Sequence, residues 1–236
     1  MSRAVDELLE RLPALGPCRA PIEESIQRLL MALQAGGKIL VCGNGGSAAD
    51  SEHFVADLMK GFIRRRPIPE AERTRLRTVA GSRGEGIAAA LQGAIAAIAL
   101  ASQGPLMTAI ANDIRYDMVF AQQVYGLGRP GDVLIVISTT GNSPTVVNAA
   151  CVAHLRGMVV IALTGRVGGE AATVADIGIR VPADTVFEIQ ELHLPVYHAI
   201  ALALEDSFFP DPPDIVAEPI PLEPTAATDA AGHQTL

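Results

Sequence analysis

The fold is decided by one short stretch, Val41-Cys42-Gly43-Asn44-Gly45-Gly46-Ser47. An apolar run at 38–42 leads into it and predicts a buried strand, and residues 48–59 after it predict a helix. Glycines at such a corner let backbone N–H groups approach an anion, and the helix N-terminus adds a positive partial charge. Ser47 is expected to cap the helix and to donate its hydroxyl. The corner therefore predicts a phosphate-binding turn; the alternative is a turn that only joins a strand to a helix.

A second polar loop, Ser138-Thr139-Thr140-Gly141-Asn142-Ser143, follows the apolar run 132–137 and precedes a predicted helix at 144–156. Strands and helices alternate along the chain, which predicts an α/β fold whose parallel sheet is covered on both faces. Further strands are predicted at 94–101, 158–163 and 177–181, and further helices at 2–15, 21–34, 105–111, 118–127 and 186–209. Ligands of such sheets bind beyond the carboxyl ends of the strands, so we expect both loops to contact one phosphate.

Two helices carry side chains that could bind a metal ion. His53 and Asp57 stand one turn apart on the first, and Gln190 and His198 share a face of the last. These four side chains could converge on one divalent cation, and two imidazoles favour zinc. A surface ion pair between His53 and Asp57 is the alternative, and the spacing does not decide between them. Glu191 and His193, their neighbours in sequence, are expected at the rim of such a site.

Composition narrows the class of protein. Of the 236 residues 49% are hydrophobic and 19% are charged, enough to bury a large core. No apolar run reaches the roughly 18 residues that span a bilayer, and the first residues lack the apolar core of a signal peptide. A net charge of −8 argues against a nucleic-acid groove. Cys42 and Cys151 lie among apolar residues and are expected to be buried free thiols. We therefore expect a soluble, cytoplasmic protein that binds neither membrane nor nucleic acid.

Three segments lie outside the regular alternation. The helices within residues 1–36 are expected either to join an oligomer or to cover their own domain. Residues 67–93 contain Gly81, Gly84 and Gly86, which argue against a continuous helix, and the segment reads as an insertion near the surface. Seven arginines at 64–83 are expected on a solvated face, partly balanced by glutamates. Residues 210–236 hold six prolines, five acids and no Lys or Arg, and are expected to be disordered.

Six motifs occur in order along the chain, GNGGSAADSEHF, AIAND, ISTTGNS, ALTGRVGG, IRVP and IQELHLPVYH. Together they resemble the sugar isomerase (SIS) domain superfamily, and within it the phosphoheptose (sedoheptulose-7-phosphate) isomerase family. The resemblance covers about residues 20–209 apart from the insertion. It implies a SIS domain at 37–209, with a five-stranded parallel sheet flanked by helices in a flavodoxin-like three-layer sandwich. It also implies a homotetramer with active sites between subunits, in which residues 1–36 serve oligomerisation.

The family's functional residues transfer to positions that match its motifs. Its substrate contacts fall on Asn44, Gly45, Gly46, Asn112, Asp113, Ser138, Thr139, Thr140, Ser143 and Gln190, with Ser47 matching the first serine of the signature. Its metal ligands fall on His53, Asp57, Gln190 and His198, and its catalytic carboxylate and histidine on Asp57 and His198. This chain departs from the family pattern at three positions. Asp57 replaces a glutamate, Thr140 replaces a serine, and Phe187 stands where an acid is usual.

The resemblance implies an aldose–ketose isomerase that converts sedoheptulose 7-phosphate to D-glycero-D-manno-heptose 7-phosphate through an enediol, assisted by a divalent metal, with zinc favoured. The alternative is a non-catalytic SIS protein, either a sugar-phosphate sensor or a module like the DnaA initiator-associating protein. That protein shares the GNGGSAA loop but lacks the full acid and histidine set. The presence of both Asp57 and His198 favours the enzyme.

Overall fold

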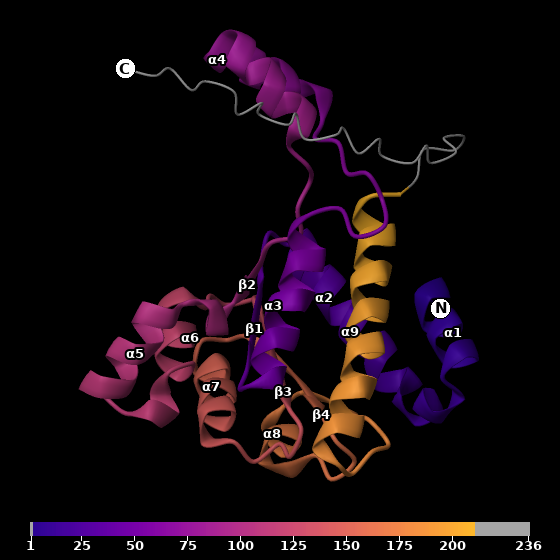
Figure 1. The fold of residues 1–236 in the computed structure, drawn as a ribbon, viewed down its shortest axis with the longest axis vertical. Helices are drawn as coiled ribbons and strands as arrows, with labels where there is room; N and C mark the ends of the chain where they lie inside the picture. The colour runs from indigo at the N-terminus through magenta and orange to yellow at the C-terminus, as the bar shows by residue number, and fades with distance from the viewer. Residues whose placement is uncertain (1, 211–236) are drawn as a thin grey trace, which may run out of the picture.

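The computed structural model describes residues 2–210 and contains one wholly parallel five-stranded sheet (Figure 1). Its strands are β1 (Ile39–Gly43), β2 (Ala97–Ala99), β3 (Val133–Ser138), β4 (Val159–Thr164) and β5 (Ile177–Arg180). They lie in the order β2-β1-β3-β4-β5. The predicted fold class is therefore confirmed.

Helices cover both faces of the sheet (Figure 1). One layer consists of α1 (Arg3–Arg11), α2 (Arg19–Gln34), α3 (Gly46–Met59) and α9 (Val186–Phe208). The other consists of α5 (Gly104–Asp113), α6 (Ala121–Leu127), α7 (Pro144–Leu155) and α8 (Gly169–Val174). Successive side chains of a strand point to opposite faces, so Ile39 and Val41 enter the first core while Leu40 and Cys42 enter the second. The short 3₁₀ turns are η1 (Pro13–Cys18), η2 (Leu100–Ser102) and η3 (Tyr116–Met118).

The order of the strands places the two polar loops next to each other. From β1 the sheet extends one way to β2 and the other way to β3, so the direction of winding reverses between β1 and β3. These two strands pair in register, with Gly43 opposite Ile137. Their following loops therefore leave the same edge at the switch point, where ligands of open α/β sheets bind.

The bounds of the predicted elements differ most from the observed ones at two places. The helix predicted at 2–15 ends at Arg11, because Pro13 cannot donate a helical hydrogen bond and a 3₁₀ turn follows. The strand predicted at 94–101 shrinks to β2, since the chain turns into η2 at Leu100. Helix α1 and helix α2 pack their buried side chains against α9 and the sheet, so within one chain they cover their own domain.

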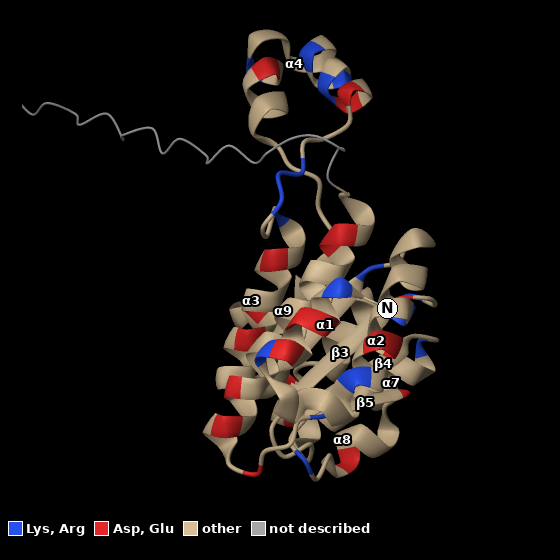
Figure 2. Cartoon of the chain, turned by 90° about the vertical axis from the view of Figure 1, so that its right-hand side faces the viewer, with Lys and Arg blue, Asp and Glu red and all other residues tan. Residues whose placement is uncertain are grey.

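The insertion forms the helical unit α4 (Glu70–Ala90), which projects from the sheet domain (Figures 1 and 2). It is not continuous: Gly81 adopts φ 54° and ψ −131°, a conformation that glycine tolerates and that breaks the helix. The expectation of no continuous helix is confirmed, but the segment is helical on both sides of the break. Most of its charged side chains are exposed, and Arg77 bridges Glu70 and Glu85.

Two expectations from composition need correction. Arg66 does not lie on a solvated face; it is only 1% exposed and forms a buried ion pair with Glu205. Cys151 is exposed, whereas Cys18 and Cys42 are the buried thiols. Within residues 2–210 the helices are all too short or too polar to cross a membrane. The prediction for the tail at 210–236 falls almost entirely outside the described residues.

Candidate active site and metal centre

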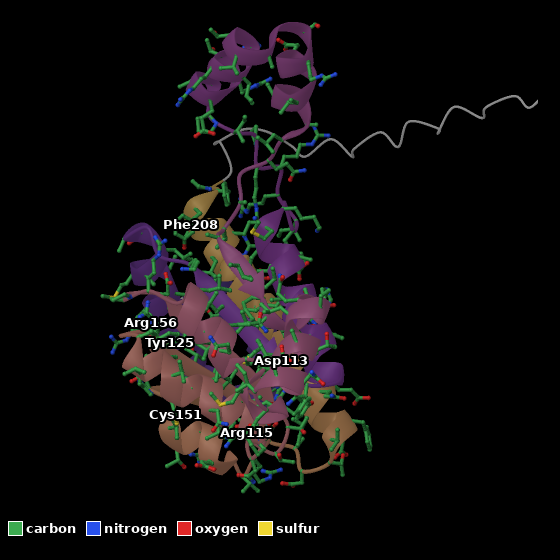
Figure 3. The ribbon with its side chains drawn as sticks, turned by 90° about the vertical axis from the view of Figure 1, so that its left-hand side faces the viewer. Asp113, Arg115, Tyr125, Cys151, Arg156 and Phe208 are labelled. Carbon is green, nitrogen blue, oxygen red and sulfur yellow. The ribbon has the colours of Figure 1, made fainter. Side chains whose placement is uncertain are left out.

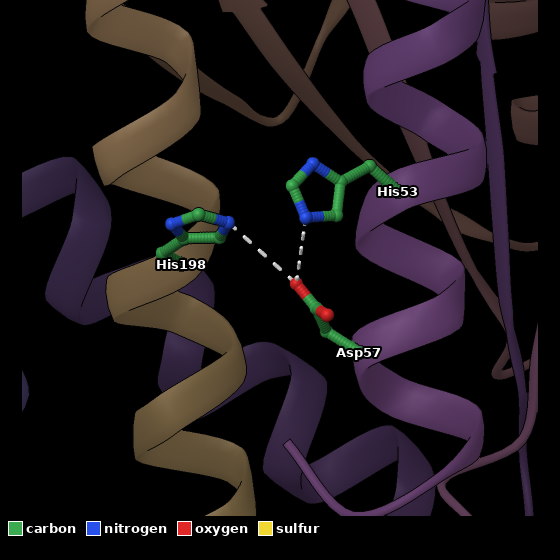
Figure 4. A group of neighbouring side chains, drawn as sticks. All are labelled: His53, Asp57 and His198. Carbon is green, nitrogen blue, oxygen red and sulfur yellow. Dashed lines mark ion pairs between the residues drawn. The ribbon is translucent and has the colours of Figure 1, made fainter. Parts of the chain in front are cut away.

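Helices α3 and α9 pack side by side and bring three potential ligands together (Figure 4). Asp57 Oδ2 lies 3.6 Å from His53 Nε2 and 3.6 Å from His198 Nε2. One ligand atom from each residue lies within 4.8 Å of the others. His53 and Asp57 meet because they are one turn apart, while His198 comes from the facing helix. The convergence predicted from sequence is thus observed for these three residues.

This cluster has the chemistry of a cation site. Asp57 Oδ2 and His198 Nε2 are buried and have no hydrogen-bond partner within the described chain. Donor atoms about 2.0–2.2 Å from a tetrahedral zinc ion lie roughly 3.4 Å from one another, close to the two 3.6 Å separations. Buried polar atoms without partners are costly, and a bound cation would satisfy them. The residues present therefore fit a divalent metal.

Gln190 lies on the same helix as His198 but is placed against the glycine loop. A Cβ atom on Gly46 would come within 2.3 Å of Gln190 Nε2, so only glycine permits this approach. Gln190 and His53 also line one hollow of about 560 Å³, together with Ala49, Asp50, Phe187, Glu191, Leu194 and Tyr197. The hollow therefore lies beside His53 and is bordered by Gln190, the side chain that packs against Gly46. Whether Gln190 ligates a metal stays a prediction.

Two residues of this hollow, Asp50 and Tyr197, were not anticipated from the sequence. The Tyr197 hydroxyl lies 3.1 Å from His53 Nδ1 and donates to Asp50 Oδ1 at 3.3 Å. Burial raises the pKa of Asp50, while the hydrogen bond from Tyr197 and the charge of His53 oppose the rise. Burial also raises the pKa of Tyr197, and the negative charge of Asp50 adds to it, so the phenol keeps its proton. Asp50 lies one turn before His53, a spacing that could have identified it.

The electrostatics of His198 suit a neutral base or ligand. Burial lowers the pKa of His198; the charge of Asp57 opposes this change, and the nearby His53 reinforces it. The imidazole therefore loses its proton at a lower pH than an ordinary histidine and offers a lone pair near neutrality. His193, expected at the rim, is instead a fully buried residue of α9. Burial lowers the pKa of His193 to about 4, with a backbone contact to Thr164 as a smaller opposing effect.

The two polar loops are joined by one side chain. Asn44 donates from Nδ2 to Ser143 Oγ at 2.8 Å and to Thr145 Oγ1 at 2.7 Å. Ser138 Oγ accepts the backbone N–H of Gly141 at 3.1 Å, which holds the second loop in its turn. The predicted meeting of the loops is therefore observed. Thr145, which the motif did not single out, belongs to the same hydrogen-bonded group.

The remaining predicted contacts of the two loops are placed as follows. Ser47 is buried in the first turn of α3, but it is not the cap; Gly45 precedes the helix with φ 55°, so the expectation of a serine cap is wrong. The Thr139 carbonyl accepts the N–H of Gly165 at 3.0 Å, which ties the second loop to the loop after β4. Thr140 Oγ1 accepts the N–H of Asn142 at 3.3 Å. The Thr139 carbonyl and the Thr140 hydroxyl thus stabilise the second loop itself.

Asn112 and Asp113 are exposed at the end of α5, where Asn112 donates to Asp113 at 2.8 Å. Figure 3 looks onto the side of the molecule that carries α5, α6 and α7, and Asp113 is visible there with Arg115 and Cys151. The His53, Asp57 and His198 cluster lies between α3 and α9. The single chain therefore does not join this pair to the cluster through any described side-chain hydrogen bond.

Comparison with known proteins gives one consistent result. The SIS domain family model matches residues 3–82 and 79–165. The phosphoheptose isomerase of Thiobacillus denitrificans is 42% identical over 200 residues, covering 84% of this chain and 87% of the relative. That of Dechloromonas aromatica is 42% identical over 198 residues, covering 83% and 88%.

Solved structures agree with these relatives. The phosphoheptose isomerase GmhA from Neisseria gonorrhoeae superimposes with a TM-score of 0.66 at 36% identity, covering 86% of this chain and 97% of that one. A phosphoheptose isomerase from Francisella tularensis gives a TM-score of 0.66 at 30% identity, covering 86% and 92%.

Proposed function

Because this chain belongs to the phosphoheptose isomerase family of SIS-domain proteins, we propose that it is a sugar-phosphate isomerase acting on sedoheptulose 7-phosphate. The product would be D-glycero-D-manno-heptose 7-phosphate. The observation that carries the proposal is the buried Asp57 carboxylate, which faces two imidazoles, one of which lines a hollow together with Gln190. We further propose that the protein works as a cytoplasmic homotetramer.

The substrate phosphate is assigned to the two polar loops. Backbone N–H groups of Gly45 and Gly46 and the hydroxyls of Ser138 and Ser143 would bind its oxygens, since helix N-termini and hydroxyls favour anions. Asn44 links the loops, so a phosphate bound to one would be held in register with the other. Gln190, which lies against Gly46, would contact the sugar between phosphate and cluster.

Proton transfer is assigned to Asp57 and His198. Isomerisation moves a proton between C1 and C2 through an enediol, which needs one base at carbon and one group at oxygen. Asp57 would take the carbon-bound proton, and His198 would move the oxygen-bound proton. Asp57 is shorter than the usual glutamate by one methylene, yet its Oδ2 lies 3.6 Å from each imidazole. This reach into the cluster supports a retained catalytic role.

A divalent cation, with zinc preferred, would be held by His53, Asp57 and His198, with Gln190 as the fourth ligand, and would polarise the substrate carbonyl. Metal analysis of protein purified without chelator should find close to one ion per chain. Removing that ion should abolish isomerisation. Protein that holds no metal and is indifferent to chelators would refute the metal site.

The direct test of the function is conversion of sedoheptulose 7-phosphate by the purified full chain, followed by NMR of the product. Formation of the aldose phosphate supports the proposal. Binding of the sugar phosphate without conversion would favour the second candidate, a non-catalytic sugar-phosphate-binding protein. The substitution of aspartate for glutamate at position 57 is the feature that keeps this candidate in view.

A further inference from the structure

Tyr197 occupies a position from which it can control His53. It is 1% exposed and immediately precedes the cluster's His198 on α9. Its ring packs edge-on against His53, with 5.6 Å between centroids and 75° between planes, and against Phe54 at 5.6 Å. By contrast, 48% of the His53 side chain is exposed. The exposed partner in this contact is therefore the histidine, and the buried one is the tyrosine.

The hydrogen bonds of the Tyr197 hydroxyl show which of its two partners donates a proton and which accepts one. The hydroxyl has a single proton, and it donates that proton to Asp50 Oδ1 at 3.3 Å. The Tyr197 oxygen is then left as an acceptor for His53 Nδ1 at 3.1 Å, which requires a proton on Nδ1. The order of donation is therefore His53 Nδ1–H to Tyr197, and Tyr197 O–H to Asp50.

This order fixes what His53 presents to Asp57. With the proton on Nδ1, Nε2 carries a lone pair, and that lone pair faces Asp57 Oδ2 at 3.6 Å. Two acceptors facing each other repel unless a cation lies between them. Partners of the second ring nitrogen commonly set the tautomer and orientation of a metal-binding histidine. Tyr197 is such a partner, because its hydroxyl contacts His53 Nδ1 while His53 Nε2 faces Asp57.

We propose that Tyr197 is a positioning residue that holds His53 in the Nδ1–H tautomer and aims Nε2 at the metal, with Asp50 as the acceptor that orients the hydroxyl. The choice of ligands rests on the function proposed above. The contact of Tyr197 with His53 Nδ1 is present in the chain without a metal and does not rest on it.

The test uses Tyr197→Phe in the full-length protein, because phenylalanine keeps the ring packing on Phe54 and removes only the hydroxyl. Zn²⁺ affinity of the metal-free protein, measured by competition with a chromophoric chelator, should fall about 10- to 100-fold. In ¹⁵N NMR of the Zn²⁺-loaded protein, the His53 signals, assigned with His53→Gln, should shift away from the Nδ1–H tautomer. Tyr125→Phe is the matched control, since Tyr125 is 54% exposed on α6; it should change neither readout.

Substitutions at Asp50 separate positioning from general destabilisation. Asp50→Asn retains a carbonyl oxygen that can accept from Tyr197 and should keep the wild-type His53 tautomer. Asp50→Ala removes the acceptor and should resemble Tyr197→Phe. If Tyr197→Phe keeps both the wild-type Zn²⁺ affinity and the His53 tautomer, the inference is overturned. If the wild type shows this tautomer and loses it in Tyr197→Phe but never turns over sugar phosphate, the inference stands and the proposed function fails.

Discussion

At the scale of single residues, the chain uses hydroxyl and amide groups where many phosphate sites use Lys or Arg. Ser138 shows how one side chain serves both structure and binding. Its hydroxyl oxygen accepts the N–H of Gly141 while its own proton remains available for an anion. It is 7% exposed, so a bound phosphate oxygen would be shielded from water there.

Ser138→Ala should therefore weaken binding of sedoheptulose 7-phosphate by about 1–3 kcal/mol, the range for hydrogen bonds to charged groups. Isothermal titration with metal-loaded protein measures this directly. Ser207→Ala, which removes a hydroxyl bonded only within α9, is the control and should leave binding unchanged. Equal affinities for Ser138→Ala and the wild type would mean that the second loop does not hold the phosphate.

The burial of His193 leads to a prediction about how the stability of the protein depends on pH. The folded chain lowers its pKa from 6.5 to about 4, so on acidification the unfolded state binds a proton before the folded state does. The contribution of His193 to the free energy of unfolding is therefore fully present above pH 6.5. It is lost as the pH falls toward 4, by up to about 1.4 kcal/mol per pH unit. The measurement is urea unfolding at fixed protein concentration over a range of pH. The free energy of unfolding of His193→Gln should fall less steeply with decreasing pH than that of the wild type.

A His193→Gln protein with the wild-type slope between pH 6.5 and 4 would show that His193 is not the group responsible.

At the scale of elements, a buried ion pair ties the end of α3 to α9. Arg66 donates to Glu205 at 2.8 Å and to the carbonyls of Leu58 at 2.7 Å and Asp57 at 3.1 Å. Both side chains of the pair are wholly buried. Glu205 also accepts the N–H of Phe62 at 2.9 Å, at the start of the segment that leads to α4. The pair thus fixes the last turn of the helix that carries Asp57.

Breaking this pair should be strongly destabilising. Arg66→Met leaves the Glu205 charge buried without its partner and should lower the free energy of unfolding by about 3–5 kcal/mol. The double variant Arg66→Met, Glu205→Gln should lose less free energy of unfolding than the two single variants lose in sum, because the two side chains are in contact. Arg3→Met removes an exposed pair with Glu7 and should leave the free energy of unfolding almost unchanged. Additive effects of the two buried substitutions would contradict a coupled pair.

Elements with a clear apolar pattern were predictable, and side chains that depend on tertiary contacts were not. The runs 132–137 and 158–163 predicted β3 and β4 closely because a parallel sheet buries both faces of its strands. Helical spacing also brought His53 to Asp57. Arg66 was misread because it stands in a run of arginines, and its acid lies 139 residues away. Tyr197 was passed over because an aromatic residue on a helix ordinarily signals core packing.

At the scale of the whole molecule, the assembly remains a prediction. The family resemblance implies four subunits with active sites between them, and α1 and α2 already cover the chain's own sheet and α9. Light scattering should give a mass about four times the 24.7 kDa of one chain. A monomer that keeps full activity on dilution would contradict active sites shared between subunits.

The measurement that tests the central claim most directly is the conversion of sedoheptulose 7-phosphate in D₂O by the wild type, Asp57→Asn and Asp57→Glu, all metal-loaded. If Asp57 removes the carbon-bound proton, the wild type should form the aldose phosphate and admit deuterium at C2. Asp57→Asn should bind the sugar phosphate but not convert it, and Asp57→Glu should keep or raise the rate. Conversion by Asp57→Asn at the wild-type rate would contradict the assignment of Asp57 as the base.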